Sequence, residues 1–363
     1  MSTQRLVPVN LLQHALSSSF GLKTRLPFIL EQLSCRTAIL KDELLNKRGI
    51  TKLLLPIHSP LQSKLFALDK IHSSYDSHDF INSASIYEAI STEILTYISL
   101  HKEKVIEIRN RYGKSDEESD EEKSLRVILS RTHMLSTSMR LLASSAFTIS
   151  DIRNSNNGRA LKVNRILNLS SLLRSSTIEV RAFCVEKFGT APGVEISSNE
   201  SASSSSIVGI QELVCFAYVE LLKNAMTAMI ARYTAAGVED ASDIKVEIKG
   251  DSYYVYITVT DSAVDLNKPQ SSQLTRLYTH HPFRLFSSVA PAARQEIDYK
   301  YSREFGVPFS GSGLGLLRSE LFCNLHGGNV QLFPSITNNG TSARIVLDRS
   351  GTMSDIEALN SIR

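Results

Sequence analysis

The sequence predicts an α+β protein in which an all-helical N-terminal domain is followed by a sandwich of helices and a β-sheet. Apolar residues in the first half recur at three- and four-residue steps, which is the period of a helix. The second half adds segments in which apolar and polar residues alternate, as they do in half-buried strands. A serine-rich stretch, 197–206, lies early in the second half and indicates a flexible loop.

The chain is long enough for about two domains and has an ordinary composition. It has 363 residues, of which 42% are hydrophobic, and a net charge of +3. Lys and Arg are spread along the sequence, so charge gives no argument for nucleic-acid binding. No apolar run approaches the roughly 20 residues that cross a bilayer, so we expect no membrane span. The four cysteines show no metal-binding spacing, and we expect reduced thiols.

The N-terminal segment has a composition of its own. The first 30 residues contain no Asp or Glu, and they carry Arg5, Lys23 and Arg25 beside a serine cluster and an apolar patch. This pattern is typical of a mitochondrial transit peptide, and an ordinary N-terminal helix is the other interpretation. We therefore treat residues 1–24 as a candidate targeting segment.

Residues 25–186 are predicted to form a helical bundle. Four isoleucines recur at four-residue steps, at Ile86, Ile90, Ile94 and Ile98. A second apolar stripe covers 125–142, and a third begins at Val163 and continues to Phe183. Each stripe has the spacing that places apolar side chains on one face of a helix.

Residues 187–350 are predicted to form the α+β domain, with a tail at 351–363. An apolar helix is expected from about 210 to 234, and another that ends near Leu325. Alternation predicts four strands, at 244–249, 254–260, 329–333 and 342–347. Gly250-Asp251 between the first two is a hairpin signal.

The first candidate site residues lie in the helix predicted over 210–234. Glu220 and Asn224 are four residues apart, so they share one helical face. The Glu220 carboxylate can act as a base, and the Asn224 amide oxygen suits a hard cation such as Mg²⁺. Two polar residues that align by chance are the alternative interpretation of this pair.

Three further candidates follow in the C-terminal half. Asp261 ends a predicted strand, where a buried carboxylate can accept a hydrogen bond from an adenine amino group. Thr341 opens the last strand, and its hydroxyl can reach the same end of a nucleotide. Between them, a glycine-rich segment precedes a helix and lets the backbone approach phosphates: Gly311-Ser312-Gly313-Leu314-Gly315-Leu316.

This order of motifs resembles the GHKL superfamily of gyrase, heat-shock chaperone, histidine kinase and MutL ATPases. The segments Glu220–Met226 and Phe183–Ile196 more closely resemble the mitochondrial kinases of pyruvate dehydrogenase and branched-chain α-ketoacid dehydrogenase. Gly327–Leu332 is similar to the hairpin that follows the lid in those kinases. The resemblance spans about residues 25 to 350 and is stronger in the C-terminal half.

The resemblance implies a function and a location. It implies a GHKL-type α/β sandwich that binds ATP and Mg²⁺ and phosphorylates a serine on the E1 subunit of a 2-oxoacid dehydrogenase complex. It also implies a homodimer in the mitochondrial matrix whose helical domain binds the E2 lipoyl domain.

The resemblance assigns roles to residues of this chain. Glu220 is the implied base and Asn224 the implied Mg²⁺ ligand. Asp261 and Thr341 hold adenine, and the glycine-rich segment lines the triphosphate: Gly311, Gly313, Gly315 and Leu316. Lys223 matches a lysine of the family and faces either phosphate or solvent.

The chain departs from the family after Asp261. Ala263 and Asp265 stand where the family has two glycines. If both positions need a positive φ, each replacement costs roughly 1–2 kcal/mol of strain. This departure supports an alternative, a catalytically weak or inactive pseudokinase that acts as a structural or regulatory subunit.

Overall fold

The computed structural model describes isolated positions between 31 and 141, residue 362, and the longer segments 163–198, 206–236, 243–263, 315–335 and 340–349. The described positions between 31 and 141 are helical, and Met134, Leu135 and Leu141 among them are buried. The rest of the helical bundle predicted for 25–186 lies outside the described residues, apart from its last segment. The bundle therefore stays a prediction.

The chain divides into two compact units, and the second of them, Val163–Thr352, holds the candidate site. This unit begins earlier than the boundary that we expected between residues 186 and 187. The difference is helix α8 (Leu169–Phe188), whose buried face shares one apolar core with helix α9 (Gln211–Ala236). Because α8 buries its apolar side chains in that core, it belongs to the α+β domain.

The predicted helical stripe that starts at Val163 is wrong over its first residues. Val163–Asn168 forms strand β1, which pairs antiparallel with β3 (Ser206–Ile210) in a two-stranded sheet. The helix begins only at Leu169, because the Asn168 side chain caps it by accepting a hydrogen bond from the Ser171 N–H at 3.0 Å. Gly189 ends α8 in a left-handed conformation, with φ of 76°.

Within the described residues, the main sheet has five strands in the order β2-β4-β5-β7-β6. Of these, β2 and β4 pair in parallel, and the other neighbours are antiparallel. The strands are β2 (Val194–Ser198), β4 (Ile244–Gly250), β5 (Tyr254–Thr260), β6 (Asn329–Ser335) and β7 (Gly340–Asp348). Four of the five match predicted strands, whereas β2 was not predicted.

The predicted hairpin between β4 and β5 is confirmed, and Asp251 holds its turn. One carboxylate oxygen of Asp251 accepts hydrogen bonds from the N–H groups of Tyr253 at 2.8 Å and Tyr254 at 2.7 Å. The other oxygen accepts from the Tyr256 hydroxyl at 2.8 Å. These three donors lower the pKa of Asp251.

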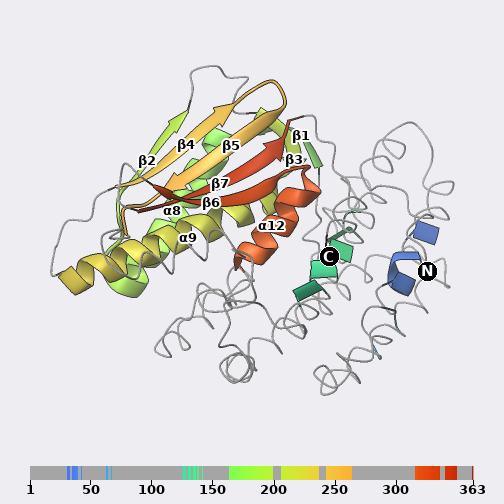
Figure 1. Ribbon diagram of the computed structural model, residues 1–363, viewed down its shortest axis with the longest axis horizontal. Helices are drawn as coiled ribbons and strands as arrows, with labels where there is room; N and C mark the ends of the chain where they lie inside the picture. The colour runs from blue at the N-terminus through green and yellow to red at the C-terminus, as the bar shows by residue number, and fades with distance from the viewer. Residues whose placement is uncertain are drawn as a thin grey trace, which may run out of the picture. The chain divides into compact units, whose positions relative to one another are not determined.

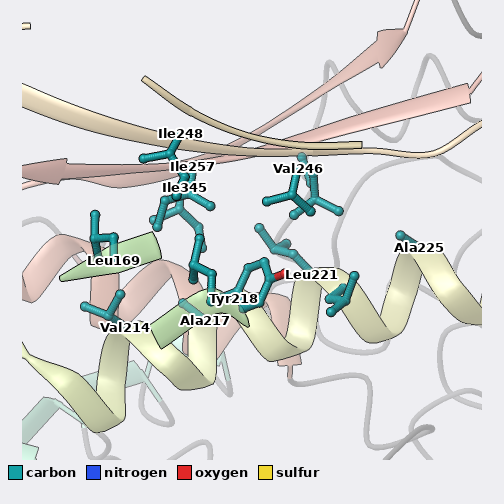
Figure 2. Close-up of a cluster of buried hydrophobic side chains, with 14 of the residues drawn as sticks. Leu169, Val214, Ala217, Tyr218, Leu221, Ala225, Val246, Ile248, Ile257 and Ile345 are labelled. Atoms are coloured by element: carbon teal, nitrogen blue, oxygen red, sulfur yellow. The ribbon is translucent and has the colours of Figure 1, made fainter. Parts of the chain in front are cut away.

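The helices α8, α9 and α12 (Gly315–Leu325) cover one face of the main sheet, so the domain is a two-layer sandwich (Figure 1). Alternate residues of each strand point into the core, which is why the sequence alternates. Figure 2 shows the α9 side chains that face the sheet residues across this core. At the centre is Tyr218, fully buried, whose hydroxyl donates to Thr177 of α8 at 2.6 Å.

Helix α9 contains a stretch, Gln211–Ile230, that is long and apolar enough to cross a membrane by length and composition. This differs from our expectation that no run approached that length. In the domain 67% of the stretch is buried under the sheet. Its apolar character is therefore that of a core helix.

Candidate functional site

Helix α9 carries Glu220 and Lys223 on its buried side. Glu220 is 7% exposed and Lys223 2% exposed. The Lys223 ammonium donates to Oε1 of Glu220 at 2.5 Å, so the two residues form a buried ion pair. The interpretation of Lys223 as a solvated helix residue is therefore wrong. Asn224, one residue further on, is exposed.

The start of α12 lies directly against Glu220. A Cβ atom on Gly315 would be 2.1 Å from Oε2 of Glu220 and 3.0 Å from its Cδ. Only glycine can occupy this position without moving the carboxylate or the helix. Gly315 is the last glycine of the predicted phosphate-binding segment, and the structure thus brings it to the predicted base. Leu316, the next residue, packs half-buried against the core.

Asp261, which follows β5, lies beside Thr341 of β7. Oδ1 of Asp261 accepts hydrogen bonds from the N–H of Ala263 at 2.9 Å and from the N–H of Thr341 at 3.2 Å. The backbone N–H of Asp261 donates to the Thr341 carbonyl at 2.9 Å. Asp261 is 6% exposed, so this carboxylate is both buried and fixed in orientation.

Asp261, Ser262, Gly340 and Thr341 lie together where β5 ends and β7 begins, and we call this group the Asp261 corner. A second close approach stabilises it. A Cβ on Gly340 would be 1.7 Å from the carbonyl oxygen of Asp261. The backbone of β7 therefore touches the backbone that follows β5. Ala263, two residues after Asp261, is half-buried and packs against the core.

Helix α9 connects the two groups of residues. The N–H and hydroxyl of Ser262 both point to the sulfur of Met229, at 3.4 and 3.5 Å. Glu220 and Met229 lie nine positions apart in α9, which is about 14 Å along a helix. The Glu220 carboxylate and Gly315, at the start of α12, thus lie near one end of this span. The Asp261 corner lies near the other end.

Two further predicted site residues, Gly311 and Gly313, lie outside the described residues. Asp265, which replaces the second glycine of the resembled pattern, lies outside them too. Within the described part of the chain, no group of three or more His, Cys, Asp or Glu side chains is placed to hold a metal ion. A Mg²⁺ ion at Asn224 would therefore need ligands beyond these side chains, such as phosphate oxygens and water.

Two functional groups on α12 and just after it were not found from the sequence. His326 is 1% exposed; its Nε2 accepts from the Ile210 N–H at 3.0 Å and its Nδ1 donates to the Phe322 carbonyl at 2.7 Å. Burial lowers the pKa of His326. Glu320 accepts a hydrogen bond from the Val330 N–H, and burial raises the pKa of Glu320 to about 7. A lone His or Glu in an apolar helix gives no periodic signal.

The cysteines are reduced thiols, as expected from their spacing. Cys184 and Cys323 are buried, and burial raises the pKa of Cys184 to about 11 and that of Cys323 well above its ordinary value. Cys215 lies 3.0 Å from the Ser176 hydroxyl, and burial raises its pKa too. None of these three thiols has the lowered pKa of a nucleophile.

No protein-family model matches the chain, and no curated protein matches it. Among solved structures, the chain is similar to the nucleotide-free catalytic domain of the histidine kinase ThkA. The identity is 14% and the TM-score 0.36, and the similarity covers 52% of this chain and 99% of that one. The class that the described domain itself defines is a two-layer α+β sandwich with a mixed sheet.

Proposed function

We propose that the α+β domain binds ATP with Mg²⁺ along α9. The observation that carries the proposal is the convergence of four segments that are distant in sequence. Gly315 touches Glu220 near one end of the span, and Thr341 bonds to Asp261 at the other. Met229 of α9 contacts the residue after Asp261, so α9 is common to both ends.

The Asp261 end has the chemistry for a purine amino group. Two backbone N–H groups hold Oδ1 of Asp261, so the plane of its carboxylate is set before any ligand binds. A buried carboxylate of fixed orientation favours a donor such as an adenine amino group and disfavours a carbonyl at the same place. Thr341 lies beside it on β7, and its hydroxyl would offer a further polar contact.

The other end has the chemistry for phosphates. Helix α12 begins here, and the N–H groups of its first turn favour negative charge. Asn224 is exposed close to Glu220 in the helix, and its amide oxygen suits Mg²⁺ that also binds phosphate oxygens. The glycine-rich segment that precedes α12 in sequence would supply further backbone contacts.

The reaction that we propose is transfer of the γ-phosphoryl group to a protein serine. Glu220 takes the proton of the serine hydroxyl while the serine oxygen bonds to the γ-phosphorus of ATP. The bond between the γ-phosphorus and the β–γ bridging oxygen breaks, and ADP leaves. The acceptor and setting follow only from the resemblance described above: an E1 subunit of a pyruvate or branched-chain dehydrogenase complex, an E2 lipoyl domain as anchor, a homodimer, and the mitochondrial matrix.

Ligand-induced stabilisation tests the nucleotide site. Mg-ATP at 100 times its dissociation constant should stabilise the protein by about 2.7 kcal/mol, because it binds only the folded state. Asp261→Asn should remove most of this effect while Oδ1 keeps its two N–H donors. Asp251→Asn, which changes an exposed carboxylate in the β4–β5 turn, is the matched control. No stabilisation of the wild-type protein at millimolar Mg-ATP would contradict the proposal.

A second candidate function is a nucleotide-binding pseudokinase with a structural or regulatory role. The specific observation that favours it is the burial of Glu220 in an ion pair. The resemblance adds that Ala263 stands where the dehydrogenase kinases have a glycine. A phosphotransfer assay with purified E1 and labelled Mg-ATP separates the two functions. The kinase transfers label and loses transfer in Glu220→Gln; the pseudokinase binds Mg-ATP and transfers none.

A further inference from the structure

We propose that Lys223 and Gly315 are positioning residues that hold the Glu220 carboxylate from two sides. We call this pair of contacts the Glu220 clamp. In the reaction proposed above, the clamp sets where the base points, and this part of the inference rests on the proposed function. The clamp itself is a property of the folded domain and is testable without a nucleotide.

The burial of Lys223 argues for a role toward Glu220. Lysine is rarely buried without a partner, because removing an ammonium group from water is costly. The Lys223 side chain is 2% exposed, and its ammonium lies 2.5 Å from Oε1 of Glu220. A surface pair on β4, Lys249 with Glu247 at 2.6 Å, has side chains 53% and 44% exposed. The two pairs have the same chemistry and differ in burial.

Gly315 leaves the space that the other oxygen occupies. A Cβ added at Gly315 would be 2.1 Å from Oε2 of Glu220. A side chain at this position would therefore displace the carboxylate from the place it has beside Lys223. The last glycine of the glycine-rich segment is therefore needed for the contact between α12 and α9, besides any contact with phosphate.

The far end of α12 is fixed as well. His326 follows the helix and bonds to the Ile210 N–H where β3 meets α9.

A double-mutant cycle on thermal stability tests the clamp. Glu220→Gln and Lys223→Gln should each lower the melting temperature, because each leaves a buried charge without its partner. The double variant should lose clearly less than the sum of the two single losses. The same cycle on Glu247 and Lys249 should be additive, because that pair is exposed. Additive losses at Glu220 and Lys223 would overturn the clamp.

Kinetics test the positioning role. Lys223→Gln and Gly315→Ala should lower kcat by about tenfold or more and change the dissociation constants of Mg-ATP and Mg-ADP by less than about threefold. Lys223→Arg should recover part of the kcat of Lys223→Gln, because it keeps the charge. If Lys223 instead binds the γ-phosphate, Lys223→Gln weakens Mg-ATP much more than Mg-ADP, and the positioning role is refuted.

The role of the Glu220 clamp in the kinase reaction and the coupling of Lys223 to Glu220 in the folded domain can be refuted separately. A wild-type protein that transfers no phosphate refutes the proposed kinase reaction, and the positioning role with it. The stability cycle then still decides whether Lys223 and Glu220 are coupled in the folded domain.

Discussion

Replacing His326 by leucine removes the group that accepts a hydrogen bond from the N–H of Ile210 inside the domain. Glutamine at the same position offers a side-chain oxygen that can accept this bond and that does not titrate. The two substitutions therefore separate the loss of the acceptor from the loss of the titratable group.

The cost of His326→Leu follows from which groups lose a partner. The Ile210 N–H is buried and loses its acceptor, which costs about 1–3 kcal/mol. The Phe322 carbonyl loses the ring donor but keeps a contact with the His326 backbone N–H at 3.3 Å, so it adds less. For a unit of this size, each kcal/mol lowers the melting temperature by about 2–4 °C.

The same residue makes stability depend on pH. The pKa of His326 is lowered from 6.5 in the folded state, so the unfolded chain binds more protons below pH 6.5. The contribution of His326 is therefore complete above pH 6.5 and is lost as the pH falls below it. The slope is at most about 1.4 kcal/mol per pH unit for one proton.

Thermal unfolding of the wild-type protein and both variants, well above and well below pH 6.5, measures these effects. Above pH 6.5, His326→Leu should be clearly less stable than His326→Gln. Below it, the wild-type protein should lose stability relative to both variants at the same pH. A leucine variant as stable as the wild-type protein at high pH, or unchanged differences across the pH range, would refute the reasoning.

Three further predictions follow from buried groups. Glu320→Gln should raise stability above pH 7 by on the order of 3 kcal/mol, because burial disfavours the charged form of Glu320 in the folded state. The gain should vanish below pH 4.5, where Glu320 is protonated in both states, and unfolding measured from about pH 4 to about pH 8 checks it. Cys184 and Cys323 should resist alkylation at neutral pH in the folded protein and react once it unfolds, as mass spectrometry of labelled peptides will show; fast labelling of either contradicts their burial. Gly340→Ala should lower both the melting temperature and the stabilisation by Mg-ATP, because its Cβ would lie 1.7 Å from the Asp261 carbonyl oxygen, and unchanged values would contradict this contact.

Local patterns predicted the strands that have one buried face. The bounds predicted for Tyr254–Thr260 match β5, because the apolar residues Val255, Ile257 and Val259 are buried at alternate positions. Helix α9 was predicted to within two residues at each end. In both cases the signal depends only on neighbours in sequence, so no knowledge of the fold is needed.

Strand β1 was missed for the opposite reason. The apolar residues from Val163 onward fit a helical stripe that continues into α8, and what makes Val163–Asn168 a strand is pairing with Ser206–Ile210. That partner directly follows the serine-rich stretch that indicated a loop. A short apolar run does not distinguish strand from helix without its partner.

In the candidate site too, the sequence indicated the chemistry of single residues but not the contacts that depend on how the helices pack. The chemistry of Glu220, Asp261 and Thr341 suggested a site, and the hydrogen bond between Asp261 and Thr341 agrees with the expected grouping. The contact of Gly315 with Glu220, and the burial of Lys223, depend on how α12 packs on α9. No spacing in the sequence encodes that packing.

The pairing of β5 with β7 has a consequence for how the domain folds. The hydroxyls of Thr260 and Ser342 meet at 3.0 Å across a sequence separation of 82 residues. A chain must close this large loop before the centre of the sheet forms, which makes folding slow compared with local hairpins. A nascent chain that ends before β7 lacks the partner for β5, so the Asp261 corner forms only after Gly340 and Thr341 have been synthesised.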